Sequence, residues 1–420
     1  MTGAGRVLKG AAPARRARVC TALAGALVAF GALAQQTSEE DAGPRAMAAA
    51  SGSIVLYGKV SSGIDTYKAS GATAGPAFDY KSRIRVFDSF SHLGVRGSED
   101  LGGGLRAIFK IESGLNVDSG QAIGQNGGPN PNTGTLGSRN DYVGLASELG
   151  RLTFGRQNVF WTNPYVKSSS WLATNFGMQS GGFGRGMAVG VLRQSNTVQY
   201  VSPTWMGAEL IASYSPNRAE GQGPGLDANV ALWGLSVQGQ AGRWGWGYDW
   251  VRDTSAQGTL AGGQGRVLGN KLRLRYSYVP EAQIAFIWNR SDVTNGGALQ
   301  AAPSATGLPD ASPRLHQTGW MLAWSHVFAG RYHAIVEYAR IEDMTGCLVS
   351  VNCLNTHANG LIVAGRYLFS PRTRVYLSYS KWSNASNYNV DWTSAFITSA
   401  TSLSPGSSPQ IVALGLMHEF

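Results

Sequence analysis

Apolar and polar residues alternate along this chain from residue 53 onward, with a period of two. In the segment 53–67, one set of alternate positions holds Ile54, Leu56, Gly58 and Val60, and the other holds Val55, Tyr57, Lys59 and Ser61. The segments 271–278 and 372–382 repeat the pattern. Successive side chains point to opposite faces of a β-strand, so the pattern predicts strands with one apolar and one polar face. A soluble β-sandwich would alternate in the same way.

The lengths of the connections favour a membrane barrel over a sandwich. Seven tight turns are expected at residues 100–104, 148–151, 203–207, 241–243, 280–283, 329–331 and 371–372. Eight longer segments alternate with them, at 68–80, 117–137, 158–192, 217–226, 255–265, 295–314, 344–357 and 385–408. Fifteen connections give sixteen strands. Short periplasmic turns, long outer loops and an even strand number are typical of an antiparallel transmembrane β-barrel.

Such a barrel has to close on itself, because an open sheet edge finds no water in lipid to satisfy its backbone groups. The first strand is therefore expected to pair with the last, Gln410–Phe420. Sixteen strands would enclose a water-filled lumen. Aromatic residues near strand ends are consistent with girdles at the two membrane surfaces, among them Trp205, Trp244, Trp288, Trp324, Tyr332, Tyr338, Tyr367 and Phe369.

Composition agrees with an all-β chain. Glycine accounts for 56 of 420 residues and charged residues for only 14%, against about 25% in an ordinary soluble domain. After position 40 there is no apolar run of about 20 residues, so no transmembrane helix is expected.

The N-terminus is predicted to be a secretory signal peptide, residues 1–34. Five basic residues and no acidic ones precede or flank the apolar run 19–33, and Ala32–Ala34 fits a cleavage site. A second small-residue site at Ala48–Ala50 would allow cleavage as late as residue 50, and a buried N-terminal helix is the alternative to a signal. Residues 35–52 form a lead-in, and residues 53–420 the barrel.

Export changes the charge and the cysteine count. Removing residues 1–34 lowers the formal net charge from +10 to +5, which does not suggest nucleic-acid binding. Cys347 and Cys353 remain, and an oxidising compartment permits them to form a disulfide. Two free loop thiols are the alternative.

Three segments resemble a known family. They are SIVLYGKVSSGIDTY at 53–67, SHLGVRGSEDLGGGLRAIFKIESGLNVDSG at 91–120 and RNDYVGLASELGRLTFGRQ at 139–157. With the terminal Phe420, they are similar to the trimeric general porins of β-proteobacteria such as Bordetella, Burkholderia and Neisseria relatives. The chain departs from that family at His92, in its long lead-in and in a third loop without acidic residues.

The resemblance implies a general diffusion porin in the outer membrane of a Gram-negative bacterium. Such a protein is a passive channel for small hydrophilic solutes and ions, with no cofactor. Its expected partners are two further copies in a homotrimer, the lipids and lipopolysaccharide of the outer membrane, and the assembly machinery that recognises Phe420.

No catalytic or metal-binding motif points to an enzyme. The six histidines are dispersed, and the chain has no H-E-x-x-H, no G-x-S-x-G and no Cys/His cluster with zinc spacing. Two other readings remain open at this point. A Ser/His pair could meet inside a barrel, as in outer-membrane phospholipases, or the barrel could be a non-conducting adhesin or receptor.

The third loop, residues 158–192, is expected to fold into the lumen, as it does in porins of this kind. Its aromatic residues could anchor it on the inner wall, namely Phe160, Trp161, Trp171, Phe176 and Phe183. A disordered outer loop is the alternative, which this density of aromatics disfavours.

Basic residues are expected to line the pore opposite this loop. By alternation Arg83, Arg85, Arg96, Arg106 and Lys110 face away from apolar neighbours, Arg156 falls at a strand end, and the loop contributes Lys167 and Arg185. Charge in a lumen stays hydrated, whereas charge on the lipid face costs about 2–4 kcal/mol at mid-membrane. The set predicts a constriction that prefers anions. Carboxylates such as Glu112, Asp118 or Asp141 entering the constriction would restore the balance, and each basic residue taken alone could be a solvated structural charge.

Overall fold

The computed structural model describes residues 52, 54–89, 91–115, 117–118, 136–160, 192–216, 231–255, 265–294, 314–347, 353–391 and 403–420. Contacts divide the chain into two units, 1–42 and 43–420, and all described residues belong to the second. The predicted signal peptide and most of the lead-in lie outside the described residues.

Seventeen strands follow one another along the described chain, each antiparallel to its neighbours. They are β1 (Ile54–Ser70), β2 (Tyr80–Asp88), β3 (His92–Gly102), β4 (Leu105–Gly114), β5 (Asp141–Ser147), β6 (Gly150–Val159), β7 (Leu192–Val201), β8 (Ala208–Ser215), β9 (Leu232–Ala241), β10 (Trp244–Ser255), β11 (Gly265–Val279), β12 (Ala282–Thr294), β13 (Arg314–Phe328), β14 (Tyr332–Ile341), β15 (Ala358–Leu368), β16 (Thr373–Asn384) and β17 (Ser408–Glu419). A 3-10 turn, η3, covers Pro76–Phe78. Within the described ranges, no helix is long and apolar enough to cross a membrane.

The barrel wall nevertheless has the sixteen predicted strands, because β2 and β3 are two halves of one. Both halves pair with β1. The second part of β1 pairs with β2, and its first part pairs with β3. Between β2 and β3, hydrogen bonds of Ser91 take the place of the regular strand-to-strand backbone bonds. Its Oγ accepts a hydrogen bond from the Ser61 backbone N–H at 2.9 Å, and its own N–H donates to Asp88 Oδ2 at 3.1 Å. Serine and aspartate side chains that bond the backbone in this way interrupt a strand locally, and the sequence pattern did not anticipate the break.

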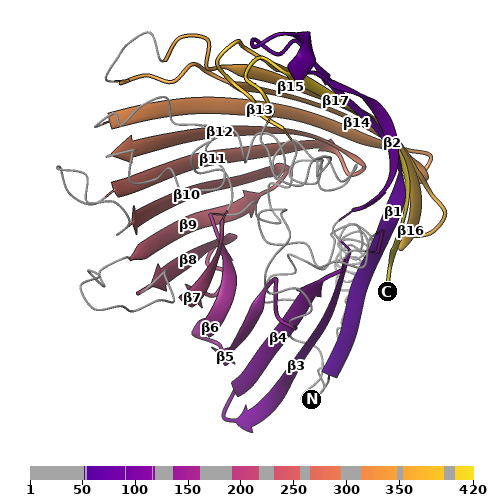
Figure 1. The fold of residues 1–420 in the computed structure, drawn as a ribbon. Helices are drawn as coiled ribbons and strands as arrows, with labels where there is room; N and C mark the ends of the chain where they lie inside the picture. The colour runs from indigo at the N-terminus through magenta and orange to yellow at the C-terminus, as the bar shows by residue number, and fades with distance from the viewer. Residues whose placement is uncertain are drawn as a thin grey trace, which may run out of the picture. The chain divides into compact units, whose positions relative to one another are not determined.

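The sheet closes where the sequence predicted. Twelve residue pairs join β1 to β17, from Lys59 opposite Glu419 to Ser70 opposite Ser408. Beyond them, Phe420 and Gly58 exchange backbone hydrogen bonds of 3.0 and 3.1 Å. In Figure 1 the yellow β17 accordingly lies beside the indigo β1. Closure leaves neither of these strands with a free edge.

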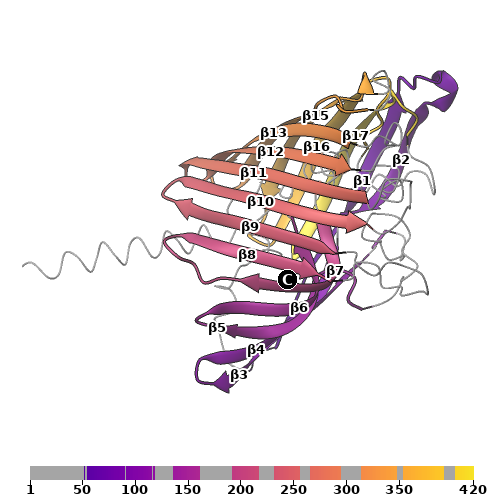
Figure 2. The same ribbon diagram turned by 90° about the vertical axis from the view of Figure 1, so that its left-hand side faces the viewer.

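All seven predicted tight turns fall between strands, at the same end of the sheet (Figure 2). Left-handed backbone conformations explain their glycines: Gly102, Gly103 and Gly104 have φ of 87°, 60° and 79° in the turn between β3 and β4. The predicted long segments separate the strands at the opposite end.

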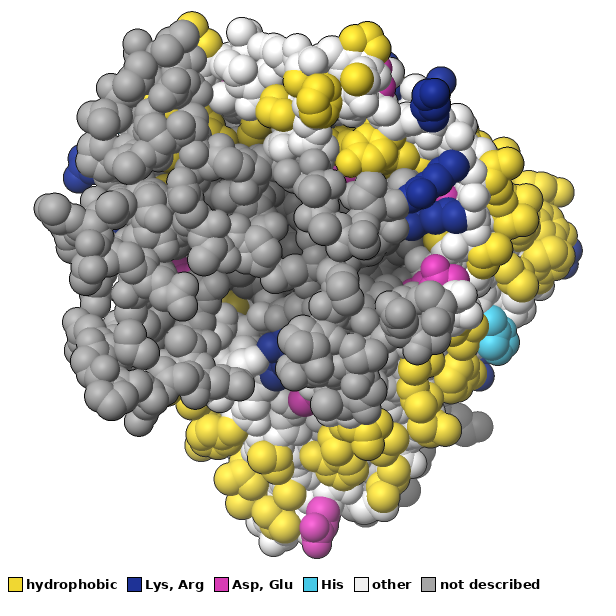
Figure 3. Space-filling view, viewed as in Figure 1, with side chains coloured by type: hydrophobic (Ala, Val, Ile, Leu, Met, Phe, Trp, Pro, Cys, Tyr) yellow, Lys and Arg dark blue, Asp and Glu magenta, His cyan; other side chains and the backbone are white. Residues whose placement is uncertain are grey.

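The two faces of the wall follow the predicted alternation. On β1, Ile54 and Leu56 are 73% and 60% exposed, whereas Tyr57 and Lys59, which follow on the opposite parity, are buried. On β11, Leu272 is exposed and Arg273 is fully buried. In Figure 3 apolar side chains accordingly gather on the outside of the wall, at the right over β1 and β16 and at the bottom over β3–β5. The apolar parity therefore faces outward and the polar parity inward.

Aromatic side chains form two rows on the outward face of β9–β15. Near the tight turns, Trp244 packs against Tyr276 with ring centroids 4.6 Å apart, and Tyr332 packs against Tyr367 at 5.4 Å. The other row includes the pair Trp320–Tyr338 at 5.5 Å. On β13, Trp320 and Phe328 are eight residues apart, or about 27 Å along a strand. That spacing is comparable with the apolar band of roughly 25 Å in outer-membrane barrels.

We expect Leu274→Arg to lower the free energy of unfolding of the membrane-inserted barrel by about 2–4 kcal/mol, because the new guanidinium would face lipid between the two aromatic rows. Urea titration in phospholipid vesicles, with the folded fraction read from heat-modifiable migration on a gel, measures the change. Arg275→Gln, on the inward parity of the same strand, is the control and should cost less. Equal losses at the two positions would contradict the assignment of the faces.

Candidate functional site: charged clusters on the inner wall

A tyrosine on β1 and a glutamate on β4 meet across β3. The hydroxyl of Tyr57 donates a hydrogen bond to Glu112 Oε2 at 2.8 Å, although the two residues are on strands that are not neighbours. Gly94 lies between them in register, and a Cβ there would come within 2.3 Å of the Tyr57 ring. Glycine marks the point where the ring crosses the backbone, so Gly94 makes this contact possible.

Three basic groups surround that single carboxylate. Lys110 Nζ lies 2.9 Å from Glu112 Oε2, and Arg139 Nε lies 2.6 Å from its Oε1. The guanidinium of Arg96 lies 5.2 Å from the centre of the Tyr57 ring, and Lys110 Nζ lies 5.4 Å from it on a cation–π contact. We call these five residues, Tyr57, Arg96, Lys110, Glu112 and Arg139, the Glu112 cluster. Its formal charge is +2.

A second ion pair joins β1 to β2. Arg85 forms a bidentate pair with Asp65, Nε to Oδ1 at 3.0 Å and Nη2 to Oδ2 at 3.0 Å. The two residues are directly opposite in register. Arg83 lies two positions before Arg85 on the same face of β2. The bidentate pair with Asp65 fixes the Arg85 guanidinium. Arg83 lies beside it and is exposed.

The inner face of β10 and β11 carries a third cluster, whose residues follow the polar parity of the sequence but are not among the predicted pore-lining residues. Arg273 Nη2 lies 2.7 Å from Asp249 Oδ1, and both side chains are buried. Gly247 provides the space, since a Cβ there would lie 2.7 Å from Arg273 Nη2. Lys271 is fully buried two positions away on the same face. Alternation was the signal that could have found these residues.

The third loop begins by turning inward. Phe160, the last described residue before it, has a φ of 55° and is buried. Its carbonyl accepts a hydrogen bond from Lys271 Nζ at 3.1 Å, and the same Nζ lies 4.1 Å from the centre of its ring. Lys271 is on β11, five strands from the end of β6. This contact agrees with the predicted anchoring role of Phe160; Trp161, Trp171, Phe176 and Phe183 lie outside the described residues.

The remaining predicted pore residues are scattered or not described. Arg106 is near the tight-turn end of β4, opposite Asp100, four positions from Lys110 and thus about 13 Å along the strand. Arg156 is half-buried; its Nη1 bonds Ser195 Oγ and its Nε donates to the Ser138 carbonyl at 3.3 Å. Lys167 and Arg185 lie outside the described residues.

Carboxylates lie beside the basic groups of the inner wall. One alternative left open by the sequence was that such carboxylates would balance the basic charge. Glu112 is fully buried within its cluster. Asp141 Oδ1 accepts the Glu112 backbone N–H at 2.7 Å, and Asp118 is exposed beyond β4. Further buried carboxylates are Glu209 on β8, Asp253 on β10, Glu337 on β14 and Asp88 at the end of β2. The wall is therefore mixed in sign, and the excess of basic residues is clearest in the Glu112 cluster.

The last loop also reaches inside the mouth, which the sequence did not indicate. Gln317 Nε2 on β13 donates to the Tyr388 hydroxyl at 2.6 Å, and the Tyr67 hydroxyl on β1 donates to Asp391 Oδ2 at 3.1 Å. The neighbouring loop is cross-linked, because Cys347 and Cys353 are joined by a disulfide with their Cα atoms 5.8 Å apart. Across the described ranges, no group of His, Cys, Asp or Glu could hold a metal ion.

Comparison with known proteins identifies the family. The family described as Gram-negative porin matches residues 20–387, most of the chain. This chain belongs to the Gram-negative porin family. Membership assigns it to the outer membrane of a Gram-negative bacterium, as a multi-pass β-barrel.

Individual relatives agree with the family at modest similarity. An outer membrane porin protein of Bordetella pertussis is 35% identical over 184 residues, covering 41% of this chain and 45% of the relative. The major outer membrane protein P.IB of Neisseria gonorrhoeae is 28% identical over 178 residues, covering 41% and 46%. The chain thus matches about half the length of these curated relatives.

Solved structures share the fold over a larger part of the chain. An anion-selective porin from Comamonas acidovorans aligns with a TM-score of 0.64 and 20% identity, covering 88% of this chain and 100% of that one. The trimer form of OmpT from Vibrio cholerae aligns with a TM-score of 0.53 and 16% identity, covering 88% and 100%. At these identities the likeness concerns the fold.

We expect Glu112→Gln to move the zero-current potential across a KCl gradient toward chloride. The change removes the only carboxylate of the Glu112 cluster and keeps an amide that can accept the Tyr57 hydrogen bond. Glu99→Gln, a neutralisation at an exposed position of β3 next to its tight turn, is the control and should leave the potential unchanged. The same potential for wild type and Glu112→Gln would remove this cluster from the ion path.

Proposed function

We propose that this porin is a passive, water-filled channel for small hydrophilic solutes and ions, with a preference for anions. The observation that carries the proposal is the inward face of the closed wall, where buried Lys, Arg, Asp and Glu occupy the parity opposite the outward Leu, Ile and Val. Buried charge of this kind is stable in a barrel that admits water and very costly in a dry one. A sixteen-stranded barrel is wide enough for an aqueous lumen.

The anion preference rests on the local charge ratio. The Glu112 cluster has three basic groups and one carboxylate. Arg83 and Arg85 accompany Asp65, and Lys271 and Arg273 accompany Asp249. Charge of one sign in a narrow opening with low-dielectric walls raises the local concentration of counter-ions, because the field is focused through the water. A related fold occurs in the anion-selective Comamonas acidovorans porin.

Passive diffusion is favoured over the two readings that the sequence left open. The family supports a channel over an outer-membrane hydrolase. Of the six histidines, His92 and His333 are the buried ones on inward positions, on β3 and β14. A non-conducting adhesin would require a complete plug, and the residues of the third loop beyond Phe160 lie outside the described part of the chain.

A homotrimer is the assembly that the outer surface favours. Outward positions on β1–β4 are mostly aliphatic and include no Trp or Tyr, with Phe109 on β4 as the aromatic exception; Tyr57 and Tyr67 face inward, and Tyr80 packs against Tyr67 with centroids 6.4 Å apart. Aromatic girdles mark contact with the membrane surfaces, so a sector without one suits contact with other subunits. Ile84, 72% exposed, is on this sector. A trimer form is also known for OmpT of Vibrio cholerae.

We expect the purified protein to give a zero-current potential of the chloride sign across a KCl gradient, weakening at 1 M salt, where the Debye length falls to about 3 Å. Arg96→Gln should move the potential toward cations, because Arg96 contacts the Tyr57 ring of the Glu112 cluster. Arg106→Gln, near the tight turn, is the matched control and should change it less. A wild-type potential of the potassium sign would overturn the anion preference.

A further inference from the structure

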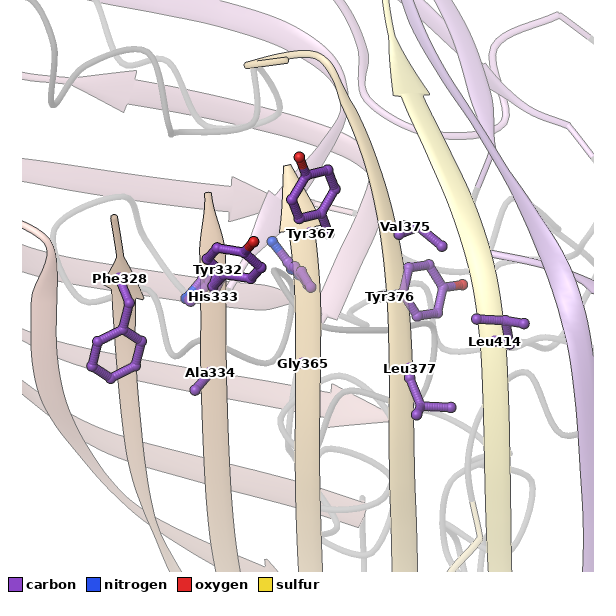
Figure 4. A pocket seen from close by; sticks show the side chains of 11 residues that line it. Phe328, Tyr332, His333, Ala334, Gly365, Tyr367, Val375, Tyr376, Leu377 and Leu414 are labelled. Atoms are coloured by element: carbon purple, nitrogen blue, oxygen red, sulfur yellow. The ribbon is translucent and has the colours of Figure 1, made fainter. Parts of the chain in front are cut away.

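An apolar groove lies on the outward face of the wall, near the tight-turn end of β13–β17. It is a cavity of about 420 Å³, and Phe328, Tyr332, Tyr367, Leu377 and Leu414 are among its lining residues. Figure 4 shows these side chains around the bare backbone at Gly365. The volume is within the range of small-molecule pockets, about 300–1,000 Å³.

The groove exists because two small residues are side by side in register. Ala334 on β14 is opposite Gly365 on β15, and Gly365 is opposite Leu377 on β16. A Cβ built at Gly365 would have no atom within 4 Å. The next outward residues on the same strand, Val363 and Tyr367, both carry large side chains. A glycine inside a strand weakens it and often marks a place where another group approaches closely.

Charge at the rim indicates the kind of group that approaches. Arg331 and Arg372 are exposed in the two adjacent tight turns. Arg331 Nη1 donates to the hydroxyl of Tyr367 at 3.4 Å, and its carbonyl accepts the Leu368 N–H at 2.9 Å, so the guanidinium lies beside the groove. The nearby Glu419 is held by Arg374, whose side chain is on the inward parity. The rim of the groove is therefore basic, and the apolar floor of the groove lies on the side toward the membrane centre.

We propose that this groove binds a phospholipid of the periplasmic leaflet, with one acyl chain over Gly365 and the phosphate against Arg331 and Arg372. The tight turns of such barrels face the periplasm, and the leaflet on that side of an outer membrane consists of phospholipid. Tyr332 and Tyr367 lie at the height where aromatic rings meet headgroups. Arginine guanidinium groups match the geometry of phosphate oxygens.

The test is the lipid that the intact oligomer retains, measured by native mass spectrometry of detergent-purified protein titrated with phosphatidylglycerol. Gly365→Leu should reduce retained lipid about tenfold, because the added side chain takes the place of several acyl methylenes. Val363→Leu adds bulk two positions along the same strand, outside the groove, and should retain lipid as the wild type does. Arg331→Gln with Arg372→Gln should lower retention of phosphatidylglycerol more than that of phosphatidylethanolamine.

Ala334→Leu narrows the same groove from β14 and provides a second variant should Gly365→Leu fail to fold. Conductance should be unchanged in both variants, since neither residue faces the lumen. Equal lipid retention by wild type and either groove variant overturns the proposal. Dissociation of the oligomer with unchanged lipid retention also overturns it, because the groove would then hold a neighbouring subunit.

Discussion

Pairing of the first strand with the last is the constraint on which the other features depend. In lipid an unpaired N–H or C=O costs several kcal/mol, so a sheet that spans a membrane has to close. Here β1 meets β17 through twelve residue pairs, and Phe420 adds two backbone bonds to Gly58. Closure determines which side chains of every strand face the lumen and which face lipid, because an inward side chain on one strand requires inward partners on the neighbouring strands.

The inner face then has to hold charge without leaving it isolated. Carboxylates and basic groups are paired there, and in two of the clusters a glycine makes room for the long side chain: Gly94 beside Tyr57 and Gly247 beside Arg273. The paired charges are fixed by short contacts, and the surplus charge of the Glu112 cluster is positive. The proposed anion preference rests on that local surplus, because a narrow opening with low-dielectric walls focuses the field of its charges.

The sequence predicted the architecture better than the site, and for a physical reason. Alternation, turn glycines and loop lengths are local properties, so strand count, closure and outward parity could be predicted from the order of residues alone. Contacts such as Tyr57 with Glu112, Lys271 with Phe160 and Gln317 with Tyr388 join residues 55, 111 and 71 positions apart. Those contacts depend both on the curvature of the barrel wall and on the register between its strands. The break between β2 and β3 arises from serine side chains that a two-residue period does not reveal.

Single-channel recording from purified protein in a planar bilayer measures whether the closed wall encloses water. We expect discrete conductance steps that occur in groups of three, with a conductance that rises with the conductivity of the bathing salt. Protein that is fully folded by heat-modifiable migration and β-rich circular dichroism, yet never conducts across repeated insertions, would contradict that expectation.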